Sequence, residues 1–179
     1  MKRPKVAQPR VRTAAPAPGA IRLKSILVPT DFSPASNVAL QYAAALAAPF
    51  AATITLLHIA EVGSMGYEHG AKDFPRMESF LRLAAEKQIA DCVPPGRAVE
   101  FKIGRGWPFG GERADREIVR MALRQRADLI VIATHGQTGL DRLILGSTAE
   151  RVVRHAPCPV LVARAAAHAA VKTKPRRRQ

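Results

Sequence analysis

The chain has 179 residues, of which 47% are hydrophobic and 23% are charged, and it carries a formal net charge of +14. This length and composition are typical of one globular domain with a buried core, and they argue against a disordered or fibrous protein. No apolar run approaches the roughly 20 residues that a membrane-spanning helix needs. The first residues are basic and rich in proline, without the apolar stretch of a secretory signal, so we expect a cytoplasmic protein.

The positive charge is concentrated at the two ends of the chain. Thirteen of the 28 Lys and Arg residues lie within 1–24 and 164–179, whereas all 14 Asp and Glu residues lie between these segments. The central part is therefore close to neutral. We expect residues 1–20 and 165–179 to form disordered basic tails around one domain at 21–164. Such tails attract polyanions through non-specific, salt-dependent contacts.

Apolar runs that are typical of buried strands alternate with helical patterns from residue 25 onward. The expected strands cover residues 25–29, 53–59, 98–103, 129–133 and 159–163. The expected helices cover 34–48, begun by Ser33 as N-cap, then 76–93, 115–125 and 147–155, while residues 63–75 are expected to form a loop. This alternation predicts an α/β fold, a single Rossmann-like three-layer domain with a five-stranded parallel sheet and helices on both faces.

The turn after the first expected strand carries a candidate binding residue. Ligands on parallel sheets bind beyond the carboxyl ends of strands, where the strand order reverses. Pro29, Thr30 and Asp31 occupy such a position. Asp31 has two interpretations: it caps the following helix, or its carboxylate accepts hydrogen bonds from a ribose hydroxyl.

A second candidate region follows the fourth expected strand. Gly146 precedes Ser147, which with Glu150 matches an S-x-x-E capping box at a helix start. The free N–H groups and partial positive charge of such a helix start suit a phosphate, and Gly136 and Gly139 would let the preceding loop fold over it. A purely structural role, with glycines that make turns and a serine that caps, explains the same residues.

Together these motifs resemble the universal stress protein family. The similar segments are V-P-T-D-F-S at 28–33, L-L-H-I at 56–59 and A-T-H-G-Q-T-G-L-D-R-L-I-L-G-S-T-A-E-R at 133–151, and the resemblance covers about residues 22–164. The ATP-binding branch of that family carries G-x2-G-x9-G-[S/T]. Its second and third glycines fall on Gly136 and Gly146 and its hydroxyl residue on Ser147, but its first glycine falls on Ala133. A methyl group there would matter if the backbone needed a positive φ.

The resemblance implies binding of ATP, or of ADP or AMP, with Mg²⁺ held through the phosphates. Asp31 would bind the ribose, Pro29 and Thr30 would shape the adenine pocket, and the backbone of Ile59 would hydrogen-bond the adenine edge. Four backbone N–H groups would hold the phosphates, those of Gly136, Gly146, Ser147 and Thr148. The remaining candidate binding residues are Ala133, His135 and Gly139.

Several other motifs are missing from the sequence. It contains neither a Walker A motif nor G-x-G-x-x-G. The two cysteines lie far apart, and no second His or Cys lies close to His135 at metal-ligand spacing. His58 is expected to be packed or hydrogen-bonded, and Cys92 and Cys158 are expected to be unpaired thiols. We assign no catalytic residue and no protein metal site, and we expect at most slow ATP hydrolysis.

The resemblance also implies a homodimer in which the last strand, at Val160, Leu161 and Val162, pairs with its copy. An exposed apolar edge strand would otherwise invite aggregation. We expect an adenine-nucleotide-binding protein of stress response or signalling, acting through nucleotide-dependent dimer or partner interactions. Two alternatives remain open: a dimeric interaction module that binds no nucleotide, which Ala133 and Gln137 favour, and a nucleic-acid-associated protein acting through its basic tails.

Overall fold

The computed structural model describes residues 21–61, 67–106, 113–134 and 145–164. Five strands form one sheet in the order β3-β2-β1-β4-β5, and all four neighbouring pairs are parallel. The strands are β1 (Ser25–Thr30), β2 (Thr53–Glu61), β3 (Val99–Gly106), β4 (Leu129–Ala133) and β5 (Val160–Ala163). The expected basic tails, 1–20 and 165–179, lie outside the described residues.

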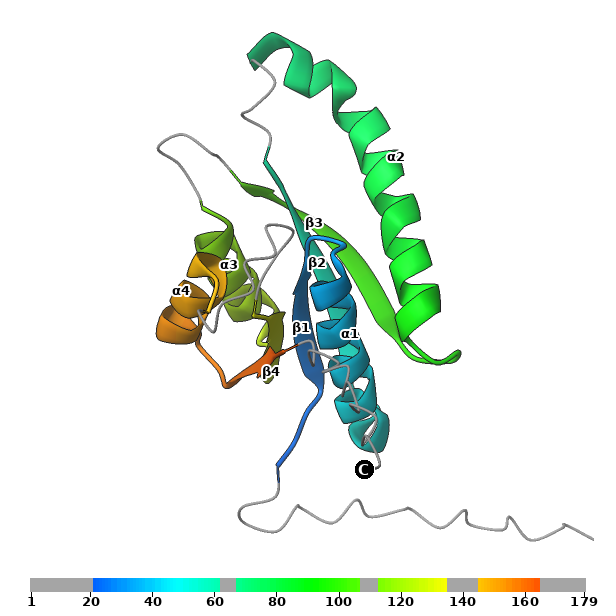
Figure 1. The fold of residues 1–179 in the computed structure, drawn as a ribbon, viewed down its shortest axis with the longest axis vertical. Helices are drawn as coiled ribbons and strands as arrows, with labels where there is room; N and C mark the ends of the chain where they lie inside the picture. Colours follow the sequence, from blue (N-terminus) through cyan, green and yellow to red (C-terminus); the bar gives the residue numbers. More distant parts are fainter. Residues whose placement is uncertain (1–20, 62–66, 107–112, 135–144, 165–179) are drawn as a thin grey trace, which may run out of the picture.

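Helices cover both faces of the sheet. They are α1 (Pro34–Ala47), α2 (Tyr67–Cys92), α3 (Ala114–Gln125) and α4 (Ser147–His155), with a short 3-10 turn at Ala48–Phe50. Figure 1 shows α1 and α2 on one face and α3 and α4 on the other. The predicted α/β architecture, with three layers and a five-stranded parallel sheet, is therefore confirmed.

Two hydrophobic cores explain why β1 is apolar at successive positions. Ile26 and Val28 belong to the core beneath α1 and α2, whereas Leu27 belongs to the core beneath α3 and α4. Successive strand side chains point to opposite faces, so a strand covered on both sides needs apolar residues in both sets. The burial of all three side chains follows directly from this arrangement.

Helix α1 begins where the sequence predicts. The Ser33 side chain accepts a hydrogen bond from the Ser36 N–H at 3.2 Å, and Pro34 occupies the first helical position. An N-cap serine satisfies one of the N–H groups that the first turn leaves without a partner, and proline lacks a donor that would need one. This local chemistry fixes the point at which β1 turns into α1.

Helix α2 is longer than predicted. It begins at Tyr67 and contains Pro75, so the expectation of a loop over 63–75 is wrong for residues 67–75. An internal proline removes one backbone hydrogen bond and bends a helix, and it does not always end one. Figure 1 shows the first turns of α2 bent away from the rest. Farther along, the helix is anchored by buried side chains at Leu81, Ala85 and Gln88.

Strands β2 and β3 also run past their predicted ends, because they pair with each other as far as Glu61 and Gly106. By contrast, β1 pairs with β2 only as far as Thr30 and His58, and it pairs with β4 only at Ile26 and Leu27. The strand order reverses at β1, which has β2 on one side and β4 on the other. A ligand crevice is expected at this switch point.

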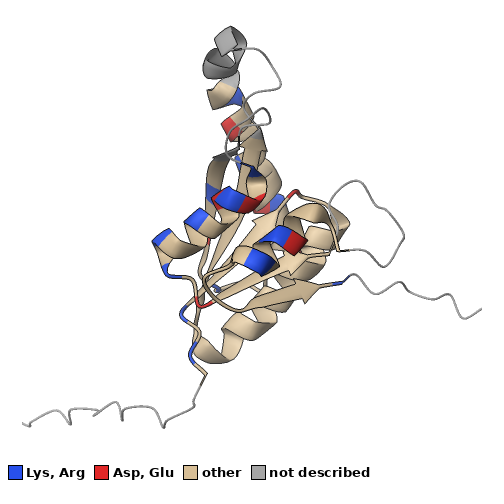
Figure 2. Ribbon diagram, turned by 90° about the vertical axis from the view of Figure 1, so that its left-hand side faces the viewer, with Lys and Arg blue, Asp and Glu red and all other residues tan. Residues whose placement is uncertain are grey.

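The described part of the chain mixes charges of both signs. Figure 2 shows Lys, Arg, Asp and Glu mainly on the helices and at turns, which agrees with the near-neutral centre of the sequence. Within these described segments, no helix has the length and apolar character needed to cross a membrane.

Candidate functional site

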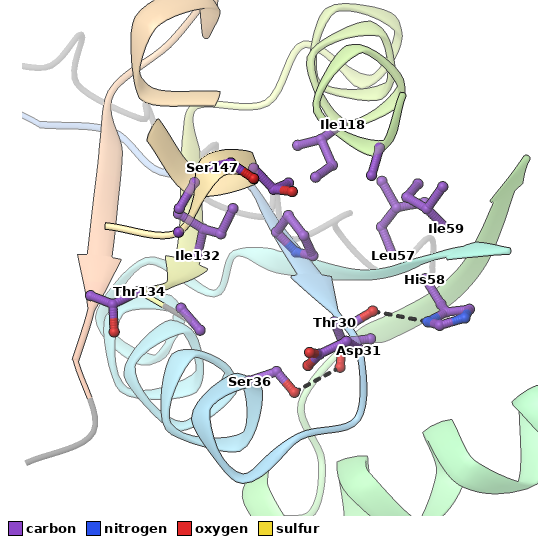
Figure 3. Close-up of a pocket in the computed structure, with 16 residues that line it drawn as sticks. Thr30, Asp31, Ser36, Leu57, His58, Ile59, Ile118, Ile132, Thr134 and Ser147 are labelled. Carbon is purple, nitrogen blue, oxygen red and sulfur yellow. Dashed lines mark hydrogen bonds between the residues drawn. The ribbon is translucent and has the colours of Figure 1, made fainter. Parts of the chain in front are cut away.

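A pocket of about 630 Å³ lies at the carboxyl ends of β1, β2 and β4 (Figure 3). Its volume falls in the range of about 300–1,000 Å³ that is usual for small-molecule sites. The wall is completed by the first turns of α1, α3 and α4. The lining residues are Pro29, Thr30, Asp31, Ser36, Leu57, His58, Ile59, Ala114, Ile118, Ile132, Ala133, Thr134, Gly146, Ser147, Thr148 and Ala149.

The structure brings most of the candidate binding residues together around this pocket. Those that line it are Pro29, Thr30, Asp31, Ile59, Ala133, Gly146, Ser147 and Thr148. His135, Gly136 and Gly139 lie outside the described residues. The sequence did not single out Ser36, Thr134 or the α3 wall at Ala114 and Ile118. Of these residues, only Thr134 had a signal in the sequence that could have identified it, because it directly follows the end of a predicted strand.

Asp31 lies at the pocket in the turn between β1 and α1. Its Oδ1 accepts a hydrogen bond from the Ser33 N–H at 3.1 Å, which closes a local turn. The N-cap of α1 is Ser33, so the alternative in which Asp31 caps the helix is wrong. The Asp31 carboxylate nevertheless lines the cavity, close to the ends of β1 and β2.

Ile59 stands just beyond the point at which β1 stops covering β2. The last pair between these strands joins Thr30 and His58, whereas β2 continues to Glu61. Ile59 is paired with Gly104 on the side of β3. The edge of β2 that faces β1 is therefore uncovered from Ile59 onward in the described residues, and backbone groups on such an edge can bind a ligand.

His58 lines the pocket and is held in one orientation. Its Nδ1 lies 2.9 Å from the Thr30 carbonyl oxygen, and its ring stacks on Phe32 with a centroid distance of 4.8 Å. A carbonyl can only accept, so Nδ1 carries the proton and Nε2 is the acceptor of the neutral ring. Burial lowers the pKa of His58, against opposing effects of the Thr30 carbonyl and of Asp31. The prediction of a packed, hydrogen-bonded histidine is confirmed.

Helix α4 begins one residue earlier than the capping-box motif predicts. Gly146 is the N-cap, with φ −58° and ψ 146°, and Ser147 is the first helical residue. The Glu150 carboxylate accepts a hydrogen bond from Arg154 Nη2 at 2.9 Å, which is an i,i+4 pair on the helix surface. The predicted Ser147–Glu150 capping box is therefore wrong, because the backbone before Ser147 already has the extended N-cap conformation.

The start of α4 offers backbone donors to the pocket. Gly146 donates its N–H to the Thr134 carbonyl at 2.8 Å, so this N–H is not available to a phosphate. In an α-helix the next N–H groups have no acceptor within the helix, and here they belong to Ser147, Thr148 and Ala149. All three residues line the cavity, and the helix start carries a partial positive charge.

Ala133 fits the pocket wall without backbone strain. It is the last residue of β4 and pairs with Ala163 of β5. Among the described residues other than glycine, only Phe32, Ala51 and Arg126 have a positive φ. The position that holds glycine in the family's ATP-binding motif therefore has no conformational need for glycine in this chain.

The site combines three chemical environments within one cavity. Leu57, Ile118 and Ile132 supply apolar walls, Asp31 supplies a carboxylate, and the start of α4 supplies N–H donors. Such a surface suits a ligand with a flat apolar ring, hydroxyl groups and an anionic end. Among the described residues, no group of three or more His, Cys, Asp and Glu side chains is arranged to hold a metal ion.

The two cysteines lie apart from this site. Cys92 and Cys158 are both unpaired, Cys92 being buried and Cys158 partly exposed. Burial raises the pKa of each thiol, with smaller contributions from Asp91 and Asp128 respectively. A raised thiol pKa reduces the thiolate fraction at neutral pH, so neither cysteine has the character of a reactive nucleophile.

The model of the universal stress protein family matches residues 22–164. A universal stress protein of Methanocaldococcus jannaschii is 34% identical over 145 residues, which cover 78% of this chain and 81% of that protein. The structure of universal stress protein UspA from Lactobacillus plantarum has a TM-score of 0.66 and 26% identity, and the match covers 81% of this chain and 100% of that chain.

A structure of a universal stress protein in complex with cAMP has a TM-score of 0.55 and 22% identity, over 80% of this chain and 98% of that chain. At this identity the likeness concerns the fold alone. The family match and the 34% identical relative are the stronger findings, since each spans most of the folded part of the sequence. This chain belongs to the universal stress protein family.

Proposed function

We propose that this universal stress protein binds an adenine nucleotide, with ATP as the preferred ligand, in the pocket at the ends of β1, β2 and β4. The observation that carries this function is the convergence of a carboxylate, an apolar slot and a helix start on one cavity. These features match the ribose, the base and the phosphates of a nucleotide in that order. The reversal of strand order at β1 places the cavity where ligands of such sheets bind.

The adenine ring is proposed to enter the apolar slot next to β2. Leu57, Ile118 and Ile132 line this part of the cavity, and the uncovered edge of β2 at Ile59 offers backbone groups to the polar edge of the base. Asp31 would then accept hydrogen bonds from the ribose hydroxyls. A hydrogen bond to a charged acceptor contributes about 1.5–3 kcal/mol, enough to favour a ribonucleotide over its dideoxy analogue.

The phosphates are proposed to lie at the start of α4, against the N–H groups of Ser147, Thr148 and Ala149. This revises the set taken from the resemblance, because the Gly146 N–H is already donated to Thr134. Mg²⁺ would be held chiefly by the phosphates, with the Ser147 hydroxyl as a further oxygen ligand. We expect binding with at most slow hydrolysis of ATP.

The functional form of the protein is proposed to be a homodimer in which β5 pairs with its copy. β5 is the last strand in the sheet order, and Val160, Leu161 and Val162 are all partly exposed. An apolar edge strand of this kind is stabilised when it pairs with another strand. We further propose that the protein acts in the cytoplasm, in stress response or signalling, and that the bound nucleotide alters its dimer or partner contacts.

The proposed adenine site is tested by measuring which nucleotide the protein prefers. Nucleotide released by denaturing the purified full chain is identified by mass spectrometry, and ATP, GTP and CTP then compete for the site against a fluorescent ATP analogue. We expect released adenine nucleotide and a clear preference for ATP. Equal competition by all three would contradict an adenine-selective site. No displacement by ATP would contradict a nucleotide site altogether and favour the dimeric interaction module.

A further inference from the structure

A buried polar cluster lies directly beneath the turn that carries Asp31. Its members come from the end of β1, the first turn of α1 and the C-terminal part of α2. Gln88 of α2 is 5% exposed and Ser36 of α1 is 2% exposed, although both side chains are polar. Buried polar groups are retained only when their hydrogen bonds are made, so each contact in this cluster has a structural consequence.

Gln88 joins three residues through the two ends of its amide. Its Oε1 lies 2.9 Å from the Thr30 hydroxyl, which donates to it. Its Nε2 donates to Ser36 Oγ at 3.1 Å and to Asn37 Oδ1 at 2.6 Å. One side chain on α2 therefore ties the end of β1 to the beginning of α1, across 58 residues of sequence.

Thr30 connects Gln88 to the β1–α1 turn through further hydrogen bonds. Its Oγ1 accepts a hydrogen bond from the Phe32 N–H at 3.0 Å, and its carbonyl accepts one from His58 Nδ1 at 2.9 Å. Figure 3 shows Thr30 at the floor of the cavity, with its Oγ1 3.1 Å from Ser36 Oγ on one side and its carbonyl hydrogen-bonded to His58 on the other. Thr30 is 7% exposed, so these contacts are made away from bulk water.

The turn itself has a backbone conformation that needs such support. Phe32 has a φ of 60°, in the left-handed region that residues with side chains seldom adopt. Its ring is stacked on His58 and its N–H is held by Thr30. Asp31 stands between these two restrained residues, so its direction toward the pocket depends on the conformation of both. Local strain of this kind persists only where surrounding contacts enforce it.

We propose that Gln88 is a positioning residue for Asp31: through Thr30 it holds the strained β1–α1 turn so that the Asp31 carboxylate faces the ribose of a bound nucleotide. Gln88 is not among the residues that line the pocket, so it would act on the ligand only through Thr30 and the turn. This inference rests on the proposed nucleotide site and adds to it a determinant on α2. If Gln88 has this role, the preference of the site for ribose over deoxyribose depends on the position of α2.

The test is the ratio of two affinities, because a merely structural role would not move that ratio. Calorimetric titration measures ATP and 2′,3′-dideoxy-ATP binding to the full chain, and the wild type is expected to favour ATP by about tenfold or more. In Gln88→Met, which keeps the length of the side chain and removes its hydrogen bonds, we expect the ratio to fall to within about twofold. The affinity for the dideoxy analogue should change little, because the base and phosphate contacts remain.

A matched control separates positioning from stability. Leu81 lies on the same helix two turns before Gln88, is 8% exposed, and takes no part in the polar cluster. Leu81→Ala should lower the thermal unfolding midpoint yet keep the wild-type ratio. If Gln88→Met is not folded, Asn37→Ala serves in its place, because it removes one of the two acceptors of the Gln88 amide and should lower the ratio partially.

The outcomes distinguish the inference from the function on which it rests. A folded Gln88→Met or Asn37→Ala variant that keeps the full preference for ATP would overturn the positioning role and leave the nucleotide site intact. A collapse of the ratio in Leu81→Ala would also overturn it, because general destabilisation would then explain the effect. No binding of either nucleotide by the wild type would overturn the proposed function itself, and this inference with it.

Discussion

Replacing Gly146 by aspartate should change stability and nucleotide binding in opposite directions. Gly146 is the N-cap of α4 but has no side chain to accept from the first turn. Its φ of −58° and ψ of 146° are open to any residue, so Gly146→Asp introduces no backbone strain. An aspartate there can accept from the helix start and interact with the helix dipole, which together stabilise the fold by about 0.5–1 kcal/mol.

The same carboxylate would stand where we place the phosphates. Two unit charges 4 Å apart repel each other by about 4 kcal/mol at an effective dielectric constant of 20. This corresponds to roughly a thousandfold loss of ATP affinity. Gly146→Asn is the matched control, because asparagine caps the helix with a similar shape and no charge, and it should keep ATP affinity within about tenfold of wild type.

Two measurements check this prediction. Urea unfolding without ligand should show Gly146→Asp to be at least as stable as wild type, and calorimetric titration should show the loss of ATP binding. If the folded aspartate variant binds ATP within about threefold of the asparagine variant, the start of α4 is not the phosphate site.

Four further predictions follow from the site and the sheet edge. Asp31→Asn should weaken ATP binding by about tenfold to a hundredfold in the same titration, because a charged acceptor is lost; unchanged affinity would remove Asp31 from the ribose site. Ala133→Gly should leave ATP affinity within about threefold and lower the free energy of unfolding by about 0.5–1 kcal/mol, because φ there is not positive; a large gain in affinity would contradict this. Burial lowers the pKa of His58 below 6.5, so the unfolded chain binds more protons and the free energy of unfolding should fall as pH drops through 6.5. Urea unfolding at about pH 7.5 and pH 5.5 should show a smaller fall in this free energy for His58→Asn than for wild type, because asparagine can still donate to the Thr30 carbonyl but does not titrate. An equal fall in both proteins would show that His58 is not the group responsible. Leu161→Lys should convert a β5-paired dimer to monomers in light scattering, and an unchanged mass would exclude pairing through that strand.

Much of the fold could be predicted because its determinants are local. The run Ile26, Leu27 and Val28 has no polar face, which is typical of a strand buried on both sides. Ser33 followed by Pro34 marks a helix start by chemistry confined to a few residues. The pocket could be predicted for a different reason: in a parallel sheet, the residues that follow the strand ends meet where the strand order reverses.

The features that escaped prediction depend on contacts between distant segments. Ser147 was expected to cap α4, but Gly146 is the N-cap, its N–H is donated to the distant Thr134, and the helix begins one residue earlier. Gln88 gave no signal in the sequence, because its partners lie on other elements. The start of α2 was missed because Pro75 is a local helix breaker that this helix accommodates.

Calorimetric titration of ATP with Mg²⁺ into the nucleotide-free full chain is the most direct test of whether the pocket is an adenine-nucleotide site. We expect saturable binding with close to one ATP per chain. No measurable heat at millimolar ATP, from a folded chain that retained no nucleotide through purification, would contradict the nucleotide site.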